Sequence, residues 1–263
     1  MSIRLEILES APSTMDIARE NLDSGKITFS NSGEPTYHGV MTYEQTEGRG
    51  QRGNSWFAIP QQSLCATFYY RDPYSSPECP QEVSLLAGVA VLEAIQQVIG
   101  TRETAPPLGL KWPNDILLNG KKMGGVLIEL AKAEDGKWVF LIGTGINLSV
   151  PSFPPAIASI ATSLTQEGLP SCTCEEMAEL IALQLVRFSA LRAEEGFSAI
   201  RERWRSYDLT RGRKYLYEEA GESRVGIAVG VTDAGHLLLE FENGNEIAVQ
   251  TASSIKEMYV RPL

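Results

Sequence analysis

The order of hydrophobic and polar residues along the chain predicts several short strands. Residues 3–9 alternate apolar and polar positions, which is the period of a half-buried strand. Residues 39–45 and 64–70 are further strand candidates. Three more β-rich runs are separated by turn residues such as Asn-Gly and Asp-Gly, so we expect hairpins among residues 110–118, 125–131 and 139–146.

Helical signals lie between these runs. Residues 83–99 are apolar on nearly every side, which predicts a central helix buried on most faces. Ser13 or Thr14 is suited to cap a helix that follows the first strand. Thr173 and Glu176 form a capping box ahead of a helix that runs to about residue 193, and its period continues to about residue 207.

The pattern changes after residue 208. Short alternating strands are joined there by Gly-, Asn- and Asp-containing turns, which predicts a small all-β module. The preceding part does not alternate regularly between strand and helix, so a doubly wound parallel sheet is disfavoured. We expect the α+β class, with a mixed, mainly antiparallel sheet flanked by helices, and two domains, 1–209 and 210–263.

Composition limits the partners. The 263 residues are 43% hydrophobic and carry 23 Lys+Arg against 33 Asp+Glu, a net charge of −10. The chain is expected to fold, and its average surface repels polyanions, so neither DNA nor a membrane is an expected partner. With four cysteines and no basic-then-apolar leader, we expect a cytoplasmic protein. The close pair Cys172 and Cys174 lacks a nearby His, so no metal site is expected.

A loop rich in glycine and arginine, Gly48-Arg49-Gly50-Gln51-Arg52-Gly53, lies between two predicted strands. Its glycines allow a ligand to approach the backbone closely, and its arginines offer forked donors to a phosphate or carboxylate. No apolar-periodic helix follows, as a dinucleotide site requires, and no Lys-Ser/Thr follows the glycines, as a Walker motif requires. A flexible surface turn is the alternative interpretation.

Lys111 lies in an apolar run directly before Trp112-Pro113-Asn114-Asp115. Burying an ammonium group is costly unless an anion binds it, so Lys111 predicts a ligand carboxylate or phosphate. The alternative is a strand lysine whose charged head reaches water. Asp115 is the nearest acid of this motif, and a structural hydrogen bond is at least as suitable a role for it.

Two glycine-containing segments follow. The run from Lys122 to Gly125 places small residues where a ligand would pass close to a strand, although plain hairpin geometry explains it as well. Gly143-Thr144-Gly145-Ile146-Asn147 ends a buried strand. The Asn147 amide offers both a donor and an acceptor, as adenine recognition requires, and is equally suited to stabilise a turn.

These four motifs, in this order, closely resemble those of biotin–protein ligases, and the resemblance covers about residues 10–150. It implies a catalytic domain related to class II synthetases in residues 1–209 and an SH3-like β-barrel in 210–263. The resemblance also implies that the protein is an enzyme, a biotin–[acetyl-CoA-carboxylase] ligase. Such an enzyme makes biotinyl-5′-AMP from biotin and Mg-ATP, then transfers biotin to a lysine of a biotin carboxyl carrier domain.

The resemblance implies roles for individual residues. Lys111 matches the family's catalytic lysine, which binds the biotin carboxylate and the α-phosphate region, and Arg52 matches a phosphate-side arginine. Magnesium would be held mostly by ATP oxygens and water, so no protein metal ligands are expected. The expected biotin-binding residues are Ser13, Thr14, Met15, Gln45, Arg49, Gly50, Gln51 and Lys111. The expected ATP- and adenylate-binding residues are Arg49, Arg52, Trp56, Lys111, Asn114 and Asn147.

The chain departs from the family pattern at two positions. Gln51 replaces the second arginine of the common Gly-Arg-Gly-Arg-Arg-Gly loop, and Met15 replaces the asparagine of the common Ser-Thr-Asn. Only 12 residues precede Ser13, too few for the DNA-binding winged helix of some members, so the monofunctional type is expected. The oligomeric state, monomer or homodimer, is left open.

Two rival functions remain from the sequence. A lipoate–protein ligase shares the fold and the adenylate chemistry but activates a different acid. A non-enzymatic nucleotide- or RNA-binding protein would use the Gly/Arg loop and the β-rich C-terminal part. The nucleotide- or RNA-binding alternative predicts a basic surface with regularly spaced aromatic residues. Residues 210–263 instead carry 6 Lys+Arg and 8 Asp+Glu, a net charge of −2.

Overall fold

The computed structural model describes residues 2–29, 36–71, 80–101, 105–219 and 222–258. β1 and β2 of its larger sheet are parallel, and all other neighbouring strands are antiparallel, so the expected mixed, mainly antiparallel sheet is confirmed. This seven-stranded sheet has the order β1 (Ser2–Ala11), β2 (Thr36–Gln45), β3 (Ser63–Tyr70), β7 (Trp138–Asn147), β6 (Lys121–Lys132), β5 (Asp115–Leu118) and β4 (Leu108–Lys111).

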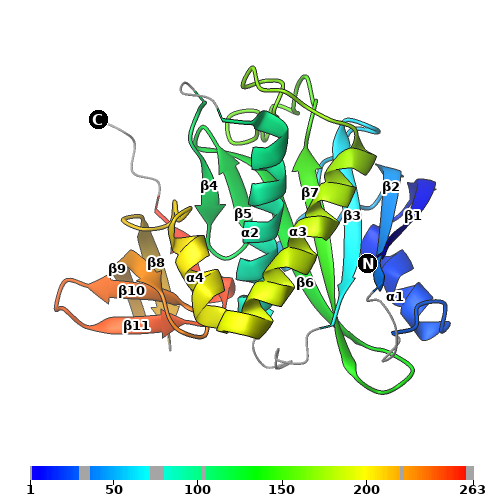
Figure 1. Ribbon diagram of the computed structural model, residues 1–263. Helices are drawn as coiled ribbons and strands as arrows, with labels where there is room; N and C mark the ends of the chain where they lie inside the picture. The colour runs from blue at the N-terminus through cyan, green and yellow to red at the C-terminus, as the bar shows by residue number, and fades with distance from the viewer. Residues whose placement is uncertain (1, 30–35, 72–79, 102–104, 220–221, 259–263) are drawn as a thin grey trace.

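Helices cover both faces of this sheet. α1 (Thr14–Asp23) packs on one face, where Ala18 and Leu22 join a cluster with Val40 and Leu141. α2 (Pro80–Ile99), α3 (Cys174–Glu195) and α4 (Phe197–Arg205) lie across the opposite face, as Figure 1 shows. The side chains that alternate along the strands are therefore buried on both sides of the central strands.

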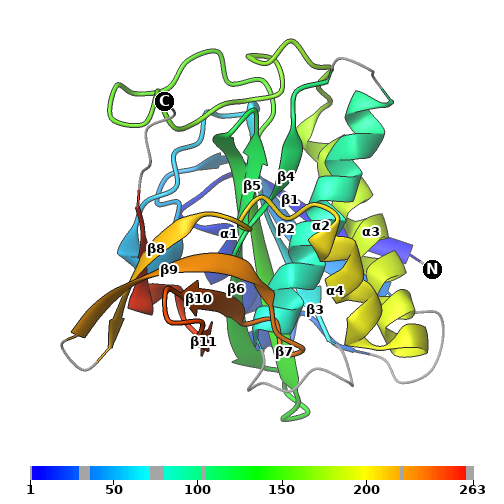
Figure 2. The same ribbon diagram turned by 90° about the vertical axis from the view of Figure 1, so that its left-hand side faces the viewer.

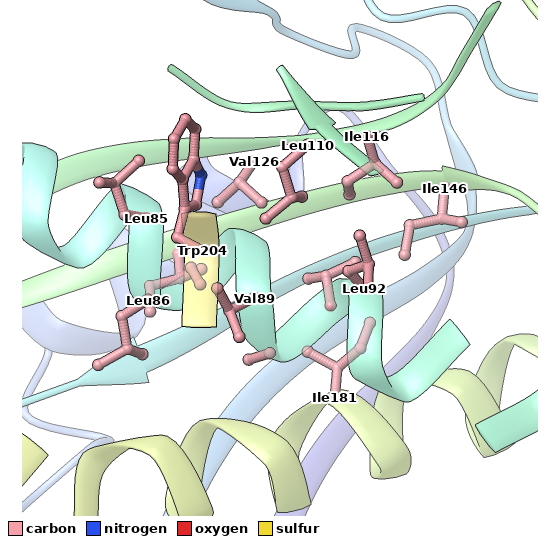
Figure 3. Packing of buried hydrophobic residues seen from close by; sticks show 14 of the residues in the cluster. Leu85, Leu86, Val89, Leu92, Leu110, Ile116, Val126, Ile146, Ile181 and Trp204 are labelled. Carbon is pink, nitrogen blue, oxygen red and sulfur yellow. The ribbon is translucent and has the colours of Figure 1, made fainter. Parts of the chain in front are cut away.

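α2 forms the centre of the main core. Its residues Leu85, Leu86, Val89 and Leu92 pack between the sheet and the other helices, together with Leu110, Ile116, Val126, Ile146, Ile181 and Trp204 (Figure 3). By length and composition alone α2 would also qualify as a membrane span, but 78% of its most apolar window is buried inside the fold. The all-round apolar pattern of residues 83–99 therefore marks a core helix, as expected.

The C-terminal part forms a separate five-stranded antiparallel sheet that packs beside α2 and α4, as Figures 1 and 2 show. Buried Tyr215, Leu237 and Leu239 from this sheet belong to the same hydrophobic cluster as α2. The expected small β domain is thus present and shares its core with the larger sheet. Its strand order is β11 (Glu246–Val249), β10 (Leu237–Phe241), β9 (Glu222–Val231), β8 (Lys214–Glu219) and β12 (Ile255–Glu257).

The structure corrects several predicted elements. The run 110–118 is two strands, β4 and β5, because the chain turns between them at a cis Trp112–Pro113 peptide bond. The helical period that continued to residue 207 is broken at Gly196, whose φ of 78° lies in the left-handed region, so α3 and α4 are separate helices. β12 was not predicted. Ser13 precedes α1 as its N-cap but makes no side-chain capping bond, whereas the capping box of Thr173 and Glu176 is confirmed.

Candidate active site

A cavity of about 350 Å³ opens where α1, the Gly/Arg loop, the turn after β4 and the C-terminal sheet meet. This volume lies in the range of small-molecule sites. Residues from all four predicted motifs line it, and so does Glu257 from β12. The cavity is lined by these predicted site residues: Ser13, Thr14, Met15, Gln45, Arg49, Gly50, Gln51, Arg52, Trp56, Lys111 and Asn114.

One wall of the cavity is a fixed polar group at the start of α1. Gln45 Oε1 accepts hydrogen bonds from the Thr14 backbone N–H at 2.9 Å and from the Thr14 hydroxyl at 3.3 Å. Thr67 Oγ1 donates to Thr14 Oγ1 at 2.9 Å, which holds the threonine from the sheet side. Thr14 and Ser13 are 3% and 1% exposed. These side chains are therefore oriented before a ligand arrives, and the Ser13 hydroxyl is not used for capping.

A second wall is apolar and depends on glycines in β7. A Cβ atom at Gly143 would lie 2.8 Å from Met15 Sδ, and one at Gly145 would lie 2.5 Å from Trp56 Cε2. The thioether and the indole ring therefore pack directly on the strand backbone, which only glycine permits at this distance. Behind them, burial raises the pKa of Cys65 to about 12, so this thiol is neutral.

The third wall carries two lysines that share one carboxylate. Asp115 Oδ1 lies 2.5 Å from Lys122 Nζ, and its Oδ2 lies 3.5 Å from Lys111 Nζ. Lys111 Nζ also lies 2.8 Å from Glu257 Oε2. The side chain of Lys111 is 22% exposed and that of Lys122 is 39% exposed, so both ammonium groups remain accessible from the cavity.

Lys122 is a residue to which sequence reasoning gave no role, although it belongs to the third motif. Its Nζ lies 5.9 Å from the centre of the Trp56 ring, and its side chain passes close to Gly125. The spacing Lys122-x-x-Gly125 was the available signal, but hairpin geometry explained it equally well. The structure supplies the missing fact, which is that Lys111 and Lys122 face the same cavity.

The Gly/Arg loop closes over the cavity as a short 3₁₀ turn, Gln51–Gly53. Arg52 has a φ of 59° within this turn, and its side chain is exposed. Arg49 Nη2 lies 2.5 Å from Asp16 Oδ1 on α1 and 3.9 Å from Glu129 Oε1 on β6. Because the Arg49 guanidinium is paired in this way, the loop offers the cavity its backbone at Gly50 and Gln51 more than the Arg49 charge.

Asn147 makes a structural hydrogen bond, and its expected role in adenine binding stays a prediction. It is 3% exposed, does not line the cavity, and its Nδ2 donates to the carbonyl oxygen of Thr162 at 3.1 Å. The amide thus ties β7 to a neighbouring loop. Asn114 lines the cavity, but its Nδ2 donates to Val126 O at 2.5 Å, so it also stabilises the turn.

The structure is an α+β fold with one cavity that is lined by all four sequence motifs. Residues 8–147 match the model of the Biotin/lipoate A/B protein ligase family, and the chain belongs to this family.

The comparisons with individual proteins agree with this assignment. The chain is 32% identical to the bifunctional ligase/repressor BirA of Bacillus spizizenii, over 82% of this chain and 65% of that protein. It is 30% identical to the biotin--[acetyl-CoA-carboxylase] ligase of Paracoccus denitrificans, over 79% of this chain and 86% of that protein. A mutant biotin protein ligase from Aquifex aeolicus, solved in complex with biotin, superimposes with a TM-score of 0.73 at 25% identity and covers 98% of this chain and 99% of that chain.

The ion pair between Arg49 and Asp16 predicts how firmly the loop is closed. Asp16→Asn is expected to increase the rate of trypsin cleavage after Arg49 or Arg52 by about twofold to fivefold, because an exposed ion pair contributes modestly. Mass spectrometry of a cleavage time course identifies the bonds cut. Asp23→Asn, at the far end of the same helix, is the matched control and should leave the rate unchanged. Equal cleavage of all three proteins would show that the ion pair does not hold the loop.

Proposed function

We propose that this protein is an ATP-dependent biotin–protein ligase of the biotin–[acetyl-CoA-carboxylase] ligase type. It first activates biotin as biotinyl-5′-AMP and then transfers biotin to a specific lysine of a biotin carboxyl carrier domain. Family membership and the activity named for the Paracoccus denitrificans relative support this proposal. The proposal rests mainly on the residues that line one cavity. The polar side chains of Thr14 and Gln45, an apolar wall and the ammonium groups of two lysines all face this space. Biotin has a matching polar ureido head, an apolar chain and a carboxylate.

In the first step, a carboxylate oxygen of biotin attacks the α-phosphorus of ATP and pyrophosphate leaves. Both reactants are anionic, so their approach requires positive charge that is already in place. We assign this role to Lys111, the expected catalytic lysine, and to Lys122, which the geometry adds. Arg52 is assigned to the phosphate side, and Trp56 and Asn114 to the adenylate.

In the second step, the uncharged amine of the carrier lysine attacks the carbonyl carbon of the adenylate, and AMP leaves. The polar group of Thr14 and Gln45, with Ser13, is assigned to the ureido head, and Met15 to the apolar part of biotin. The backbone of Arg49, Gly50 and Gln51 is assigned to closing the site over biotin and the adenylate. Excluding water from this mixed anhydride protects it from hydrolysis.

Magnesium is proposed to enter with ATP. Within the described residues, no group of three or more His, Cys, Asp or Glu side chains is suited to hold a metal ion. The two carboxylates that line the cavity, Asp115 and Glu257, are both paired with lysine. This donor set fits a magnesium ion that is bound mainly by phosphate oxygens and water.

The remaining parts of the proposal concern organisation and location. We assign catalysis to residues 1–209 and a supporting role to the β-rich residues 210–263. The net charge of −10 supports the absence of DNA binding. A cytoplasmic location is supported by Cys65, Cys172 and Cys174, which are free thiols, whereas Cys79 lies outside the described residues.

The substrate assay that tests the proposal separates it from the lipoate rival. The protein is incubated with ATP, magnesium and either biotin, lipoate or octanoate, and acyl-AMP is quantified by mass spectrometry. Biotinyl-AMP is expected from biotin, and the other two acids should yield far less acyl-AMP. Addition of a biotin carboxyl carrier domain should then convert the adenylate to a biotinylated lysine. An enzyme inert with biotin but active with lipoate would contradict the proposal, as would nucleotide binding without any acyl-AMP.

Gln51 predicts a weaker hold on the anionic adenylate than an arginine would give. Gln51→Arg is expected to slow dissociation of biotinyl-AMP by about threefold to tenfold, because it adds a charge-assisted contact near the phosphate. Stopped-flow chase with excess unlabelled biotin and ATP measures this rate. Gln51→Met, which adds no charge at a similar length, is the control. An off-rate that is unchanged or faster in Gln51→Arg would exclude this role for position 51.

A further inference from the structure

The C-terminal sheet contributes a carboxylate to the cavity. Glu257 lies on β12, which pairs with β8 so that Glu257 stands opposite Tyr215. Its Oε2 lies 2.8 Å from Lys111 Nζ, and its Oε1 accepts a hydrogen bond from Arg213 Nη1. The side chain is 28% exposed and lines the same cavity as the two lysines. A residue near the C-terminal end of the chain thus directly contacts the expected catalytic lysine.

The contact leaves Lys111 able to bind a ligand. An ammonium group has three N–H donors, and two carboxylates, Glu257 at 2.8 Å and Asp115 at 3.5 Å, surround Lys111. One direction therefore remains for an anion in the cavity. The cluster stays positive overall, since Lys111, Lys122 and Arg213 carry three positive charges against two negative charges on Asp115 and Glu257.

The charge on Glu257 persists at neutral pH. Burial would by itself raise the pKa of this carboxyl, but the hydrogen bonds and charges of Lys111 and Arg213 outweigh burial and hold the pKa below its usual value. Arg213 is itself fixed, because its Nε donates to the carbonyl oxygen of Leu209 at 2.6 Å. Glu257 is therefore an ionised acceptor at a defined position.

The C-terminal part of the chain also holds the turn that directly follows Lys111. The Trp112 backbone N–H donates to Thr210 Oγ1 at 2.7 Å, and the Trp112 indole N–H donates to Gly235 O at 2.9 Å. The C-terminal part thus contacts both the backbone next to Lys111 and its ammonium group. These contacts restrict the rotamers of a long side chain.

We infer that Glu257 is a positioning residue for the first step: it holds the Lys111 ammonium in the orientation that receives the biotin carboxylate and the α-phosphate. This inference rests on the proposed function and adds to it a role for the C-terminal sheet in adenylate formation. Glu257 touches neither substrate in this account and acts only through Lys111.

A double-mutant cycle tests the inference by measuring kcat and KM for biotinyl-AMP formation. Glu257→Gln should lower kcat about tenfold, because a misaligned charge loses most of its transition-state stabilisation, while the KM for ATP changes by less than about threefold. In a Lys111→Met background, Glu257→Gln should change kcat by no more than about twofold, because its effect passes through Lys111. Glu240→Gln removes an exposed carboxylate from β10 of the same sheet, two strands away from β8, and should leave kcat unchanged.

Three outcomes would overturn the inference. The first is an unchanged kcat for Glu257→Gln. The second is a higher kcat, which would mean that Glu257 competes with the substrate anion for Lys111. The third is an equal loss of kcat in the natural and Lys111→Met backgrounds, which would mean a general structural effect. Thermal unfolding checks that each variant folds. If Glu257→Gln does not fold, Glu257→Asp is the variant that tests the inference. It keeps the negative charge but shortens the side chain by one methylene, so the carboxylate lies farther from Lys111. The inference then requires a lower kcat at an unchanged melting temperature. An inactive wild-type protein would refute the proposed function instead, so the two failures are distinguishable.

Discussion

Two ammonium groups must be held beside one another in a partly buried cavity, and much of this structure serves that requirement. Lys111 and Lys122 carry like charges, which would repel each other if no carboxylate lay between them. Asp115 lies between them and contacts both, and Glu257 supplies a second negative charge to Lys111. The cluster of Lys111, Lys122 and Arg213 with Asp115 and Glu257 therefore keeps a net positive charge that faces an anionic ligand.

The fold brings these groups together by strand pairing rather than by proximity along the chain. β5 pairs with both β4 and β6, so the end of β4 that bears Lys111 and the start of β6 that bears Lys122 meet beside Asp115. The central strand β7 contributes almost no side chains at this point, because Gly143 and Gly145 let Met15 and Trp56 rest on its backbone. Sheet register thus creates both the charged and the apolar parts of one cavity.

Local patterns in the sequence predicted most of the elements, and the ordered motifs predicted most of the cavity. The apolar pattern of α2 and the capping box of α3 each depend only on residues that are close in the sequence, so both elements could be predicted. The contact between Lys111 and Glu257 joins residues that are 146 positions apart, and no local motif encodes it. The hydrogen bond of Asn147 was not predicted for a related reason, because its partner, the Thr162 carbonyl, lies in a loop that gave no signal. The break at Gly196 between α3 and α4 was not predicted, because the apolar period of the sequence resumes after this residue.

Calorimetric titration shows whether the positive wall of the cavity recognises the carboxylate of biotin, as we propose. The natural protein is titrated in parallel with biotin and with biotin carboxamide, which has the same ring and chain but no charge. We expect one site per chain and binding of biotin at least about tenfold tighter than that of the carboxamide, with the difference decreasing at high salt. Equal affinity for the two compounds, or no binding of biotin, would contradict it.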